Sequence, residues 1–257
     1  MKEHYSFMIE NSESYKVHIV ILTWNNNKIL KRCLESIENV DHKNFTISVV
    51  DNNSSDDSLK MISENFPNIQ TIKNSKNFKF GRGYNEGLKK INVEDNDFII
   101  LLNDDTIVSR NFIDELINPL AKDQKAIIST PKILYSSNIN KIWYAGGVVD
   151  LRRGLIYHIG IRDFDGPKYS FINETHYATG CCMCLRFEDL KKLNFFDETF
   201  DMYCEDVDLC LRIKKNKFKI KKMSEIVISH EGQYASNKDL NFFFTHMKSL
   251  LRLNIYR

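Results

Sequence analysis

The sequence predicts an α/β fold: a single domain with a mostly parallel central sheet flanked by helices, plus a C-terminal helix. Short apolar runs rich in branched residues alternate with segments whose apolar residues recur at helical spacing. The 257 residues, 42% of them apolar, suffice for one sizeable core. No internal repeat and no low-complexity linker divides the chain, so we expect one main domain.

The first half of the chain is typical of alternating strands and helices. Residues 17–22 form a continuous apolar run, as in a strand covered on both faces. Apolar residues at helical spacing follow at Leu30, Cys33, Leu34 and Ile37. The other elements expected in this half are strands at 45–50, 69–72 and 98–102 and helices at 56–61 and 83–91.

The pattern is weaker in the second half. Short strand-like pieces occur at 126–128, 148–149 and 181–185. A helix is expected from near Glu205, with a strand at 225–229 after it. The last stretch, 240–256, predicts a basic helix that packs on the domain, with a position on a membrane surface as the alternative.

Charge and cysteine content narrow the class of protein. Lys and Arg total 36 against 34 Asp and Glu, so a net charge of +2 gives no reason to expect nucleic acid. The basic stretch 212–222 is interpreted as a solvated face, with contact to an anionic membrane or to phosphate as the alternative. The six cysteines lack the spacing of a structural zinc site and are expected to be buried thiols.

Localisation is expected to be cytoplasmic. The N-terminus is polar and does not resemble a signal peptide. No apolar run approaches the roughly 20 residues that cross a bilayer. A cytoplasmic protein of this kind could in addition contact the inner face of the membrane through its basic C-terminal region, and this alternative stays open.

Glycine placement excludes several nucleotide-binding modes. The first glycine of the chain is Gly81, so the turn after the first strand lacks the glycine-rich fingerprint of a dinucleotide fold. No stretch matches a phosphate loop ending in Gly-Lys-Ser/Thr, and no Gly-x-Ser-x-Gly elbow is present. Dehydrogenases, P-loop enzymes and the common serine hydrolases are therefore disfavoured.

Polar residues follow the expected strands instead. The first strand ends in Thr23 and Asn25, the second leads into 51–56, and the strand at 98–102 leads into 103–106. Open α/β sheets bind ligands at this carboxyl edge. Asp51 could accept the imide proton of uracil or thymine, and the carboxylates after the later strand suit a hard cation. Each segment alone is also an ordinary turn signal.

Taken together, these blocks resemble family 2 glycosyltransferases, whose fold is called GT-A, and within them the bacterial rhamnosyltransferase-like branch. The resemblance covers about 17–236. It rests on Val20-Ile21-Leu22-Thr23-Trp24-Asn25, Val50-Asp51-Asn52-Asn53-Ser54, the segment 77–87, Leu101-Leu102-Asn103-Asp104-Asp105-Thr106, the segment 196–212 with its Glu205-Asp206 pair, and Ser229-His230-Glu231-Gly232. The segment 77–87 has Lys79 where the family usually has glycine.

The resemblance implies a role for each block. Nucleotide and donor would be bound by Thr23, Asn25, Asp51, Asn53, Asn77, Gly83, Asn85, Asn103 and Asp104. A divalent cation, Mn²⁺ or Mg²⁺, would be held by Asp105 and His230. The Glu205-Asp206 pair would supply the catalytic base, with Asp206 favoured because a helix N-terminus stabilises carboxylate. Asp208, four residues before Arg212, is expected to form a helical ion pair instead.

The implied activity is transfer of a sugar from a UDP- or dTDP-linked donor to a hydroxyl of a glycan or lipid-linked glycan, in bacterial surface polysaccharide or glycan synthesis. One base with direct attack predicts inversion at the anomeric carbon. Trp143-Tyr144-Ala145-Gly146-Gly147 resembles a segment of the rhamnosyltransferase-like branch, which makes dTDP-rhamnose the first donor to test.

The expected organisation is an N-terminal lead at 1–16, a catalytic domain at 17–236 and a C-terminal helix at 237–257. The catalytic domain would comprise a nucleotide-binding half, 17–105, and an acceptor half, 106–236. Two alternatives stay open from the residues. One is a sugar-phosphate nucleotidyltransferase, although no early glycine-rich loop is present, and the other is a noncatalytic sugar or nucleotide binding module.

Overall fold

The structure, a computed structural model, describes residues 14–170, 174–230, 248–249 and 252–253. The N-terminal lead therefore lies almost entirely outside the described residues. The helices are α1 (Asn27–Ile37), α2 (Ser58–Asn65), α3 (Gly81–Leu88), α4 (Phe112–Lys122), α5 (Phe187–Lys192) and α6 (Glu205–Lys215). The strands are β1 (Val17–Thr23), β2 (Phe45–Asp51), β3 (Gln70–Lys73), β4 (Phe98–Asn103), β5 (Thr106–Ile107), β6 (Ala126–Tyr135), β7 (Asn138–Tyr144), β8 (Gly147–Asp150), β9 (Leu155–His158), β10 (Cys182–Arg186) and β11 (Lys219–His230).

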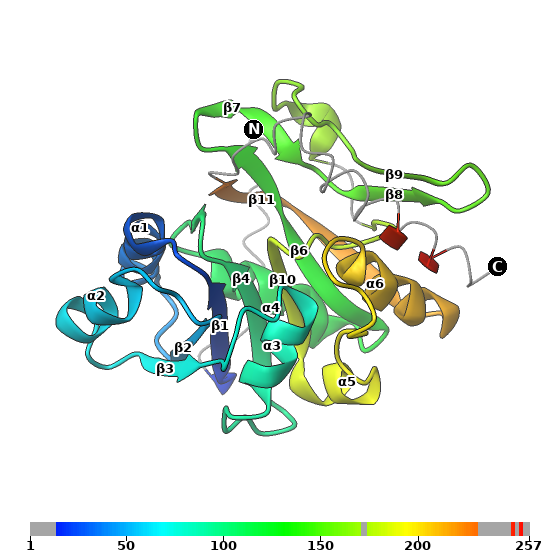
Figure 1. Ribbon diagram of the computed structural model, residues 1–257. Helices are drawn as coiled ribbons and strands as arrows, with labels where there is room; N and C mark the ends of the chain where they lie inside the picture. Colours follow the sequence, from blue (N-terminus) through cyan, green and yellow to red (C-terminus); the bar gives the residue numbers. More distant parts are fainter. Residues whose placement is uncertain (1–13, 171–173, 231–247, 250–251, 254–257) are drawn as a thin grey trace.

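Most strands of the central sheet run in one direction. Within the described residues the sheet has nine strands in the order β3-β2-β1-β4-β10-β6-β11-β5, and β7 pairs with β6 (Figure 1). The pairings make β1, β2, β3, β4, β6 and β11 parallel to one another, whereas β5, β7 and β10 run the opposite way. The predicted α/β fold with a mostly parallel sheet is confirmed.

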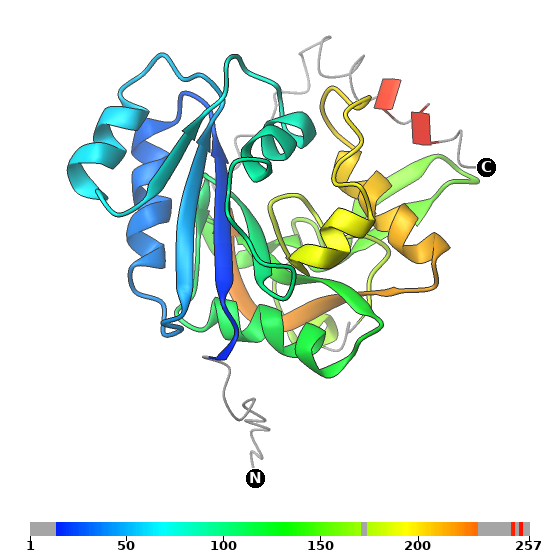
Figure 2. The same cartoon turned by 90° about the horizontal axis from the view of Figure 1, so that it is seen from below.

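Helices cover both faces of the sheet. Figure 2 shows α1 and α2 side by side on one face of β1 and β2, with α3 on the other. The buried side of α1 consists of the four residues with helical spacing, Leu30, Cys33, Leu34 and Ile37. A second sheet, the antiparallel pair β8-β9, extends from the far end of the molecule. Because β1, β2 and β4 are parallel, their polar carboxyl ends lie at the same edge of the sheet.

Two strands are longer than the sequence predicts. The piece expected at 126–128 extends to Tyr135 as β6, and the strand expected at 225–229 begins at Lys219 as β11. Their parallel pairing changes register between Lys222 and Val227, so the ladder passes Pro131 without using it as a donor. The backbone irregularity explains why the apolar pattern there is broken.

The basic stretch 212–222 is not a single solvated face, so that interpretation is wrong. Lys222 is buried, and its Nζ donates a hydrogen bond to the Tyr169 carbonyl at 2.7 Å. Burial lowers the pKa of Lys222 to about 8, and the neighbouring Lys132 lowers it further. Lys221 pairs with Glu174 at 3.3 Å. Part of this charge therefore holds the fold together.

The structure also bears on the predictions about the cysteines and the C-terminal helix. All six cysteines are free and buried, as predicted. Most of the predicted C-terminal helix lies outside the described residues, but its described part contacts the domain: Ser249 Oγ donates to the Met202 carbonyl at 3.0 Å, and Leu253 is buried. Among the described helices, none has the length and apolar character of a membrane span.

Candidate functional site

Sheet register brings together the two predicted metal ligands. Strand β5 pairs with the end of β11, and Thr106 lies opposite His230. Asp105, the residue before β5, is thereby placed beside the histidine, and the distance from Asp105 Oδ2 to His230 Nε2 is 3.1 Å. The other oxygen, Asp105 Oδ1, is buried and has no hydrogen-bond partner among the described residues. Such an orphaned carboxylate oxygen suits a missing cation.

This donor set fits a divalent metal that is completed by substrate. Carboxylate oxygen and imidazole nitrogen both bind Mn²⁺, and carboxylate suits Mg²⁺. No cluster of three or more potential protein ligands occurs within the residues that the structure describes. Asp105 and His230 alone would therefore bind a cation weakly, and diphosphate oxygens would have to supply further ligands.

Asp104 points toward the first strand. The Thr23 hydroxyl donates a hydrogen bond to Asp104 Oδ2 at 2.6 Å. Burial raises the pKa of Asp104 to about 7, and the Asp105 carboxylate also raises it, against the lowering effect of the Thr23 hydrogen bond. Asn103 ends β4, and its N–H donates to the Cys181 carbonyl at 2.9 Å. These three predicted residues lie together at one corner of the sheet.

The turn after β2 combines a buried carboxylate with exposed amides. Both oxygens of Asp51 accept the Ser54 N–H, each at 3.1 Å, and the Asp51 side chain is fully buried. Asn25 Oδ1 accepts the Ser55 N–H at 2.7 Å, which ties this turn to the end of β1. Asn25 and Asn53 are exposed. Asp51 thus shapes the turn, and the exposed amides are the groups open to a ligand.

The segment 77–87 keeps the backbone path that a glycine would allow. Lys79 has φ of 64°, in the left-handed region. Its N–H donates to Asn77 Oδ1 at 2.9 Å, and its carbonyl accepts from Asn52 Nδ2 at 2.9 Å. A Cβ on Gly83 would lie 2.8 Å from Asn52 Nδ2, so only glycine fits there. Asn77 and Gly83 therefore act first by shaping the loop.

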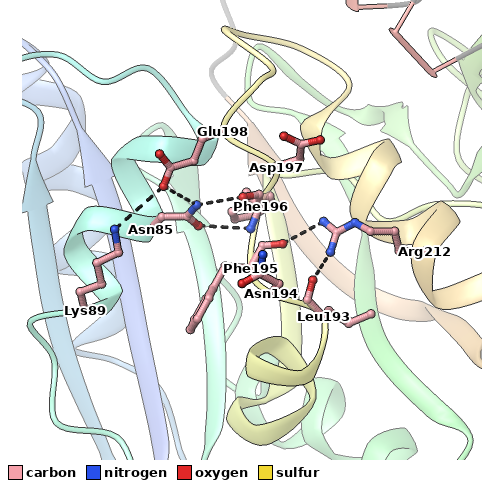
Figure 3. Close-up of a pocket in the computed structure, with 9 residues that line it drawn as sticks. All are labelled: Asn85, Lys89, Leu193, Asn194, Phe195, Phe196, Asp197, Glu198 and Arg212. Atoms are coloured by element: carbon pink, nitrogen blue, oxygen red, sulfur yellow. Dashed lines mark hydrogen bonds and ion pairs between the residues drawn. The ribbon is translucent and has the colours of Figure 1, made fainter. Parts of the chain in front are cut away.

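Asn85 faces a pocket of about 570 Å³ beside α3 and α6 (Figure 3). Its side chain donates to the Phe196 carbonyl at 2.9 Å and accepts the Phe196 N–H at 3.2 Å. Glu198 accepts from the same amide at 3.1 Å. The pocket lining does not include Asp105, Asp206 or His230. The structure therefore places Asn85 as a link between α3 and the loop before α6.

The predicted base lies at the start of α6. Asp206 Oδ2 accepts the Gly180 N–H at 2.8 Å, and its Oδ1 accepts the Val207 N–H at 2.8 Å. Burial raises the pKa of Asp206 above its ordinary value, even though both hydrogen bonds lower it. The predicted ion pair is confirmed, because Arg212 Nε donates to Asp208 Oδ2 at 2.9 Å.

Glu205 is chemically different from its neighbour. Its side chain is buried, and Oε2 has no hydrogen-bond partner within the described part of the chain. Burial, together with the negative charge of Asp206, raises the pKa of Glu205 to about 8. Glu205 therefore holds a proton at neutral pH, whereas Asp206 is the carboxylate held by backbone donors.

Two routes connect Asp206 with the metal ligands. In the first, Gly180 donates to Asp206 while the next residue, Cys181, accepts from Asn103 in the metal segment. In the second, the charge of Asp206 contributes to raising the pKa of Tyr177. The Tyr177 ring lies 6.0 Å from the His158 ring. The His158 ring contacts that of Trp143, which in turn contacts the His230 ring. Adjacent residues, Gly180 and Cys181, thus connect Asp206 with the segment that carries Asp105.

Sequence reasoning missed several residues that build this site. Asn52 and Asn74 are buried, with Asn74 Nδ2 donating to Asn52 Oδ1 at 2.9 Å beneath the 77–87 segment. Gly180 donates a hydrogen bond to Asp206, and the His158 ring contacts the rings of Trp143 and Tyr144. Amide-rich strand ends were the available signal for Asn52, whereas Gly180 and His158 carry no local signal because their contacts are distant in sequence.

The mostly parallel sheet flanked by helices is the GT-A fold of glycosyltransferases. The profile of the family described as "Glycosyl transferase family 2" matches residues 18–193, more than half of the chain, and the chain belongs to that family. It is therefore an enzyme that transfers sugar from a nucleotide donor.

The chain is similar to one relative over nearly its whole length and to a second over half of it. Rhamnosyltransferase WbbL of Escherichia coli (strain K12) is 26% identical over 254 residues, covering 92% of this chain and 91% of the relative. A Methanococcus voltae enzyme, dolichyl N-acetyl-alpha-D-glucosaminyl phosphate 3-beta-D-2,3-diacetamido-2,3-dideoxy-beta-D-glucuronosyltransferase, is 28% identical over 159 residues, 50% of this chain and 48% of that one. A third relative, the low-salt glycan biosynthesis hexosyltransferase Agl10 of Haloferax volcanii, is 24% identical over 205 residues, covering 79% of this chain and 62% of the relative.

Solved structures share the fold. GalNAc-T7, solved with UDP, GalNAc and Mn²⁺, superposes with a TM-score of 0.71 at 16% identity, covering 93% of this chain and 47% of that one. The mannosyltransferase PcManGT of Pyrobaculum calidifontis, solved with GDP-Man and Mn²⁺, gives 0.68 at 14% identity, covering 95% and 66%. This chain therefore spans about half and two thirds of the two solved chains.

Proposed function

We propose that the protein is a metal-dependent, inverting transferase in which Asp105 and His230 hold the cation and Asp206 is the catalytic base. The observation that carries the proposal is the 3.1 Å approach of His230 Nε2 to Asp105 Oδ2, beside a buried Asp105 oxygen without a hydrogen-bond partner. Strand pairing between β5 and β11 creates this approach, so the site is built into the sheet. Mn²⁺ is the first cation to test, because two solved relatives in fold contain it.

The residues would divide the reaction between them. A bound divalent cation would neutralise the charge that develops on the departing diphosphate. Asn25 and Asn53 would contact the nucleoside at the exposed turn, while Asp51 maintains the shape of that turn. Asp206 would remove the proton of the acceptor hydroxyl, because two backbone N–H groups orient its carboxylate and leave further lone pairs open.

Direct attack assisted by a single base inverts the anomeric carbon. We propose dTDP-rhamnose as the first donor to assay, since the relative WbbL is a rhamnosyltransferase by name. A lipid-linked acceptor is supported by the name of the Methanococcus voltae relative, which acts on a dolichyl-linked sugar. The division of the catalytic domain into a nucleotide-binding half and an acceptor half stays a prediction. The cellular location also stays a prediction, with a cytoplasmic protein at the membrane surface as the working hypothesis.

The test is transfer from dTDP- and UDP-sugars with Mn²⁺, with Mg²⁺ in parallel, by wild type, Asp206→Asn and Asp105→Asn. Loss of the base should lower kcat by about 10²- to 10⁴-fold with little change in donor binding. Asp105→Asn should weaken Mn²⁺ binding. Asp201→Asn is the matched control, because Asp201 is exposed and pairs only with Lys248 among the described residues.

Two results would contradict the proposal. One is a product that keeps the anomeric configuration of the donor, as read from its NMR coupling constants. The other is near-normal turnover by Asp206→Asn. A noncatalytic binding module would bind the nucleotide sugar in a calorimeter but release no nucleoside diphosphate with any acceptor.

A further inference from the structure

The ring of Trp143 lies against the ring of His230. Their centroids are 4.3 Å apart, and the ring planes are inclined by 40°. Trp143 lies near the end of β7, which pairs with β6, while His230 ends β11 on the other side of β6. A side chain from a separate strand therefore covers the imidazole that approaches Asp105.

Trp143 is itself held by a cluster of aromatic rings, here called the aromatic cluster: Trp143, Tyr144, His158 and Tyr177. The His158 ring lies 4.5 Å from that of Trp143, edge to face, and 5.0 Å from that of Tyr144. His158 Nδ1 donates to the Trp143 carbonyl at 3.1 Å, which fixes the tautomer because a carbonyl can only accept. The Tyr144 hydroxyl donates to the Tyr177 carbonyl at 2.5 Å. The tryptophan therefore has little freedom to move away from His230.

We infer that Trp143 is a positioning residue of the metal centre, which holds the His230 imidazole with Nε2 directed at Asp105. This inference rests on the proposed function. An imidazole turned about its χ angles would lose its contact with the indole face and its approach to Asp105 together. Groups that orient a metal-binding histidine typically change metal affinity by about 10- to 100-fold.

A merely space-filling tryptophan would behave differently. Its removal would lower the stability of the fold but leave the metal affinity of the folded protein unchanged. Metal affinity of the folded protein, measured separately from activity, therefore decides between the two roles. Two variants keep the comparison clean: Trp143→Phe retains an aromatic face, whereas Trp143→Leu retains apolar bulk without one.

The experiment is a titration of each full-length variant with MnCl₂ alone, followed by the electron paramagnetic resonance signal of free Mn²⁺. We expect the dissociation constant to rise by about 10-fold or more in Trp143→Leu and by less than about 3-fold in Trp143→Phe. Asp105→Asn is the reference for loss of a ligand. Circular dichroism and thermal melting establish that each variant is folded at the temperature of the titration.

Tryptophan fluorescence gives an independent readout, because the chain has only two tryptophans, Trp24 and Trp143. In Trp24→Phe, a paramagnetic Mn²⁺ ion at the site should quench Trp143 with a saturable curve. In Trp143→Phe, the remaining Trp24 is 53% exposed, and its quenching curve is subtracted from that of wild type to isolate the contribution of Trp143. Adding Asp105→Asn to Trp24→Phe should remove the saturable component.

The outcomes separate the inference from the function on which it rests. If Trp143→Leu binds Mn²⁺ as tightly as wild type while Asp105→Asn does not, Trp143 is no positioning residue, and the proposed function stands. If wild type shows no saturable Mn²⁺ binding by either method, whether with MnCl₂ alone or with UDP or dTDP present to supply diphosphate oxygens, the proposed metal site itself is wrong, and the inference falls with it.

Discussion

At the scale of single residues, the Glu205–Asp206 pair contains two carboxyl groups with different roles. Glu205 keeps its proton to a pH of about 8, since burial and the Asp206 charge both raise its pKa. Asp206 is the group that two backbone N–H donors stabilise as carboxylate. Neighbours in sequence are thereby separated by their environments, as expected where one group acts as a base.

The pH dependence of transfer should identify the base. Burial raises the pKa of Asp206, so the rate at saturating Mn²⁺ should fall as pH decreases, over a range above the ordinary aspartate value of about 4. Glu205→Gln should retain this acidic limb, and the little activity left in Asp206→Asn should lack it. A limb that disappears in Glu205→Gln but persists in Asp206→Asn would assign the base to Glu205 instead. The measurement is kcat/KM between pH 5 and about 9.

Lys79 offers a second test at this scale. A non-glycine residue at φ of 64° costs about 1 kcal/mol, and a β-branched side chain costs more. Lys79→Val should therefore lower the free energy of unfolding by about 1–2 kcal/mol. Lys79→Gly should stay within about 1 kcal/mol of wild type, because relief of strain is offset by greater freedom of the unfolded chain. Urea denaturation measures both, and equal stability of the two variants would show that the loop relaxes out of this conformation.

Local sequence patterns predicted the site residues that lie directly at the end of a strand or the start of a helix. They missed the residues whose contacts are distant in sequence. Asp105 follows a buried strand, and Asp206 lies at the start of a helix. Their place in a site could therefore be predicted from the neighbouring residues alone. Asp51 also follows a strand, but its complete burial depends on the loop folding over it, which no local pattern reports. Asn74 contacts Asn52 across a strand connection, and contacts of this kind require the tertiary fold.

At the scale of elements, the close approach of α3 to β2 determines where the donor segment lies. A Cβ on Gly87 would overlap Val50 Cγ2 and lie 2.8 Å from Val50 Cγ1. Gly87→Ala should therefore destabilise the protein by about 1–3 kcal/mol, despite the better helix propensity of alanine. The cost should shrink in the background of Val50→Ala, which removes the obstructing methyl groups. A double-mutant cycle of chemical denaturation measures this coupling, and additive effects would contradict the packing argument.

The predicted elements succeeded where the apolar period was regular. Strands β1, β2 and β4 lie within one residue of their predicted ends, and α1 buries the four apolar residues predicted for it, because each element is covered on a continuous face. Antiparallel insertion of β10 between β4 and β6 could not be predicted, since strand order depends on contacts far apart in sequence. In β6, Pro131 and Lys132 broke the apolar run, although a register shift and the Lys132–Asp165 ion pair at 2.6 Å accommodate both.

At the scale of the whole molecule, the site lies where two parts of the sheet meet. One proposed metal ligand follows β4 and the other ends β11, while the proposed base lies in the first turn of the helix that precedes β11. Correct sheet closure is therefore a condition for assembling the site, and local motifs alone would not assemble it. Function then has a cost in stability, because buried atoms such as Glu205 Oε2 are retained without a hydrogen-bond partner in the described structure.

That cost should be visible in the pH dependence of unfolding for the metal-free and nucleotide-free protein. The pKa of Glu205 rises from the ordinary 4.5 to about 8 on folding, so the folded state binds the proton more tightly than the unfolded state. The resulting stabilisation is fully present below pH 4.5 and is lost as pH rises through about 8. Its upper bound is about 5 kcal/mol, at about 1.4 kcal/mol per pKa unit, and relaxation should leave on the order of 1–3 kcal/mol.

Glu205→Gln should therefore flatten the stability curve, because an amide of the same shape does not ionise. We expect the free energy of unfolding of wild type to decline between pH 4.5 and about 8 relative to Glu205→Gln, with the two curves closest at the acidic end. Urea denaturation at a series of pH values measures the difference. Glu188→Gln is the control, because Glu188 begins a helix as Glu205 does but pairs with Lys192 at the surface at 2.6 Å. Parallel curves for wild type and Glu205→Gln would mean that Glu205 is ionised in the folded protein, and Asp206 would then no longer be the only carboxylate at the start of α6.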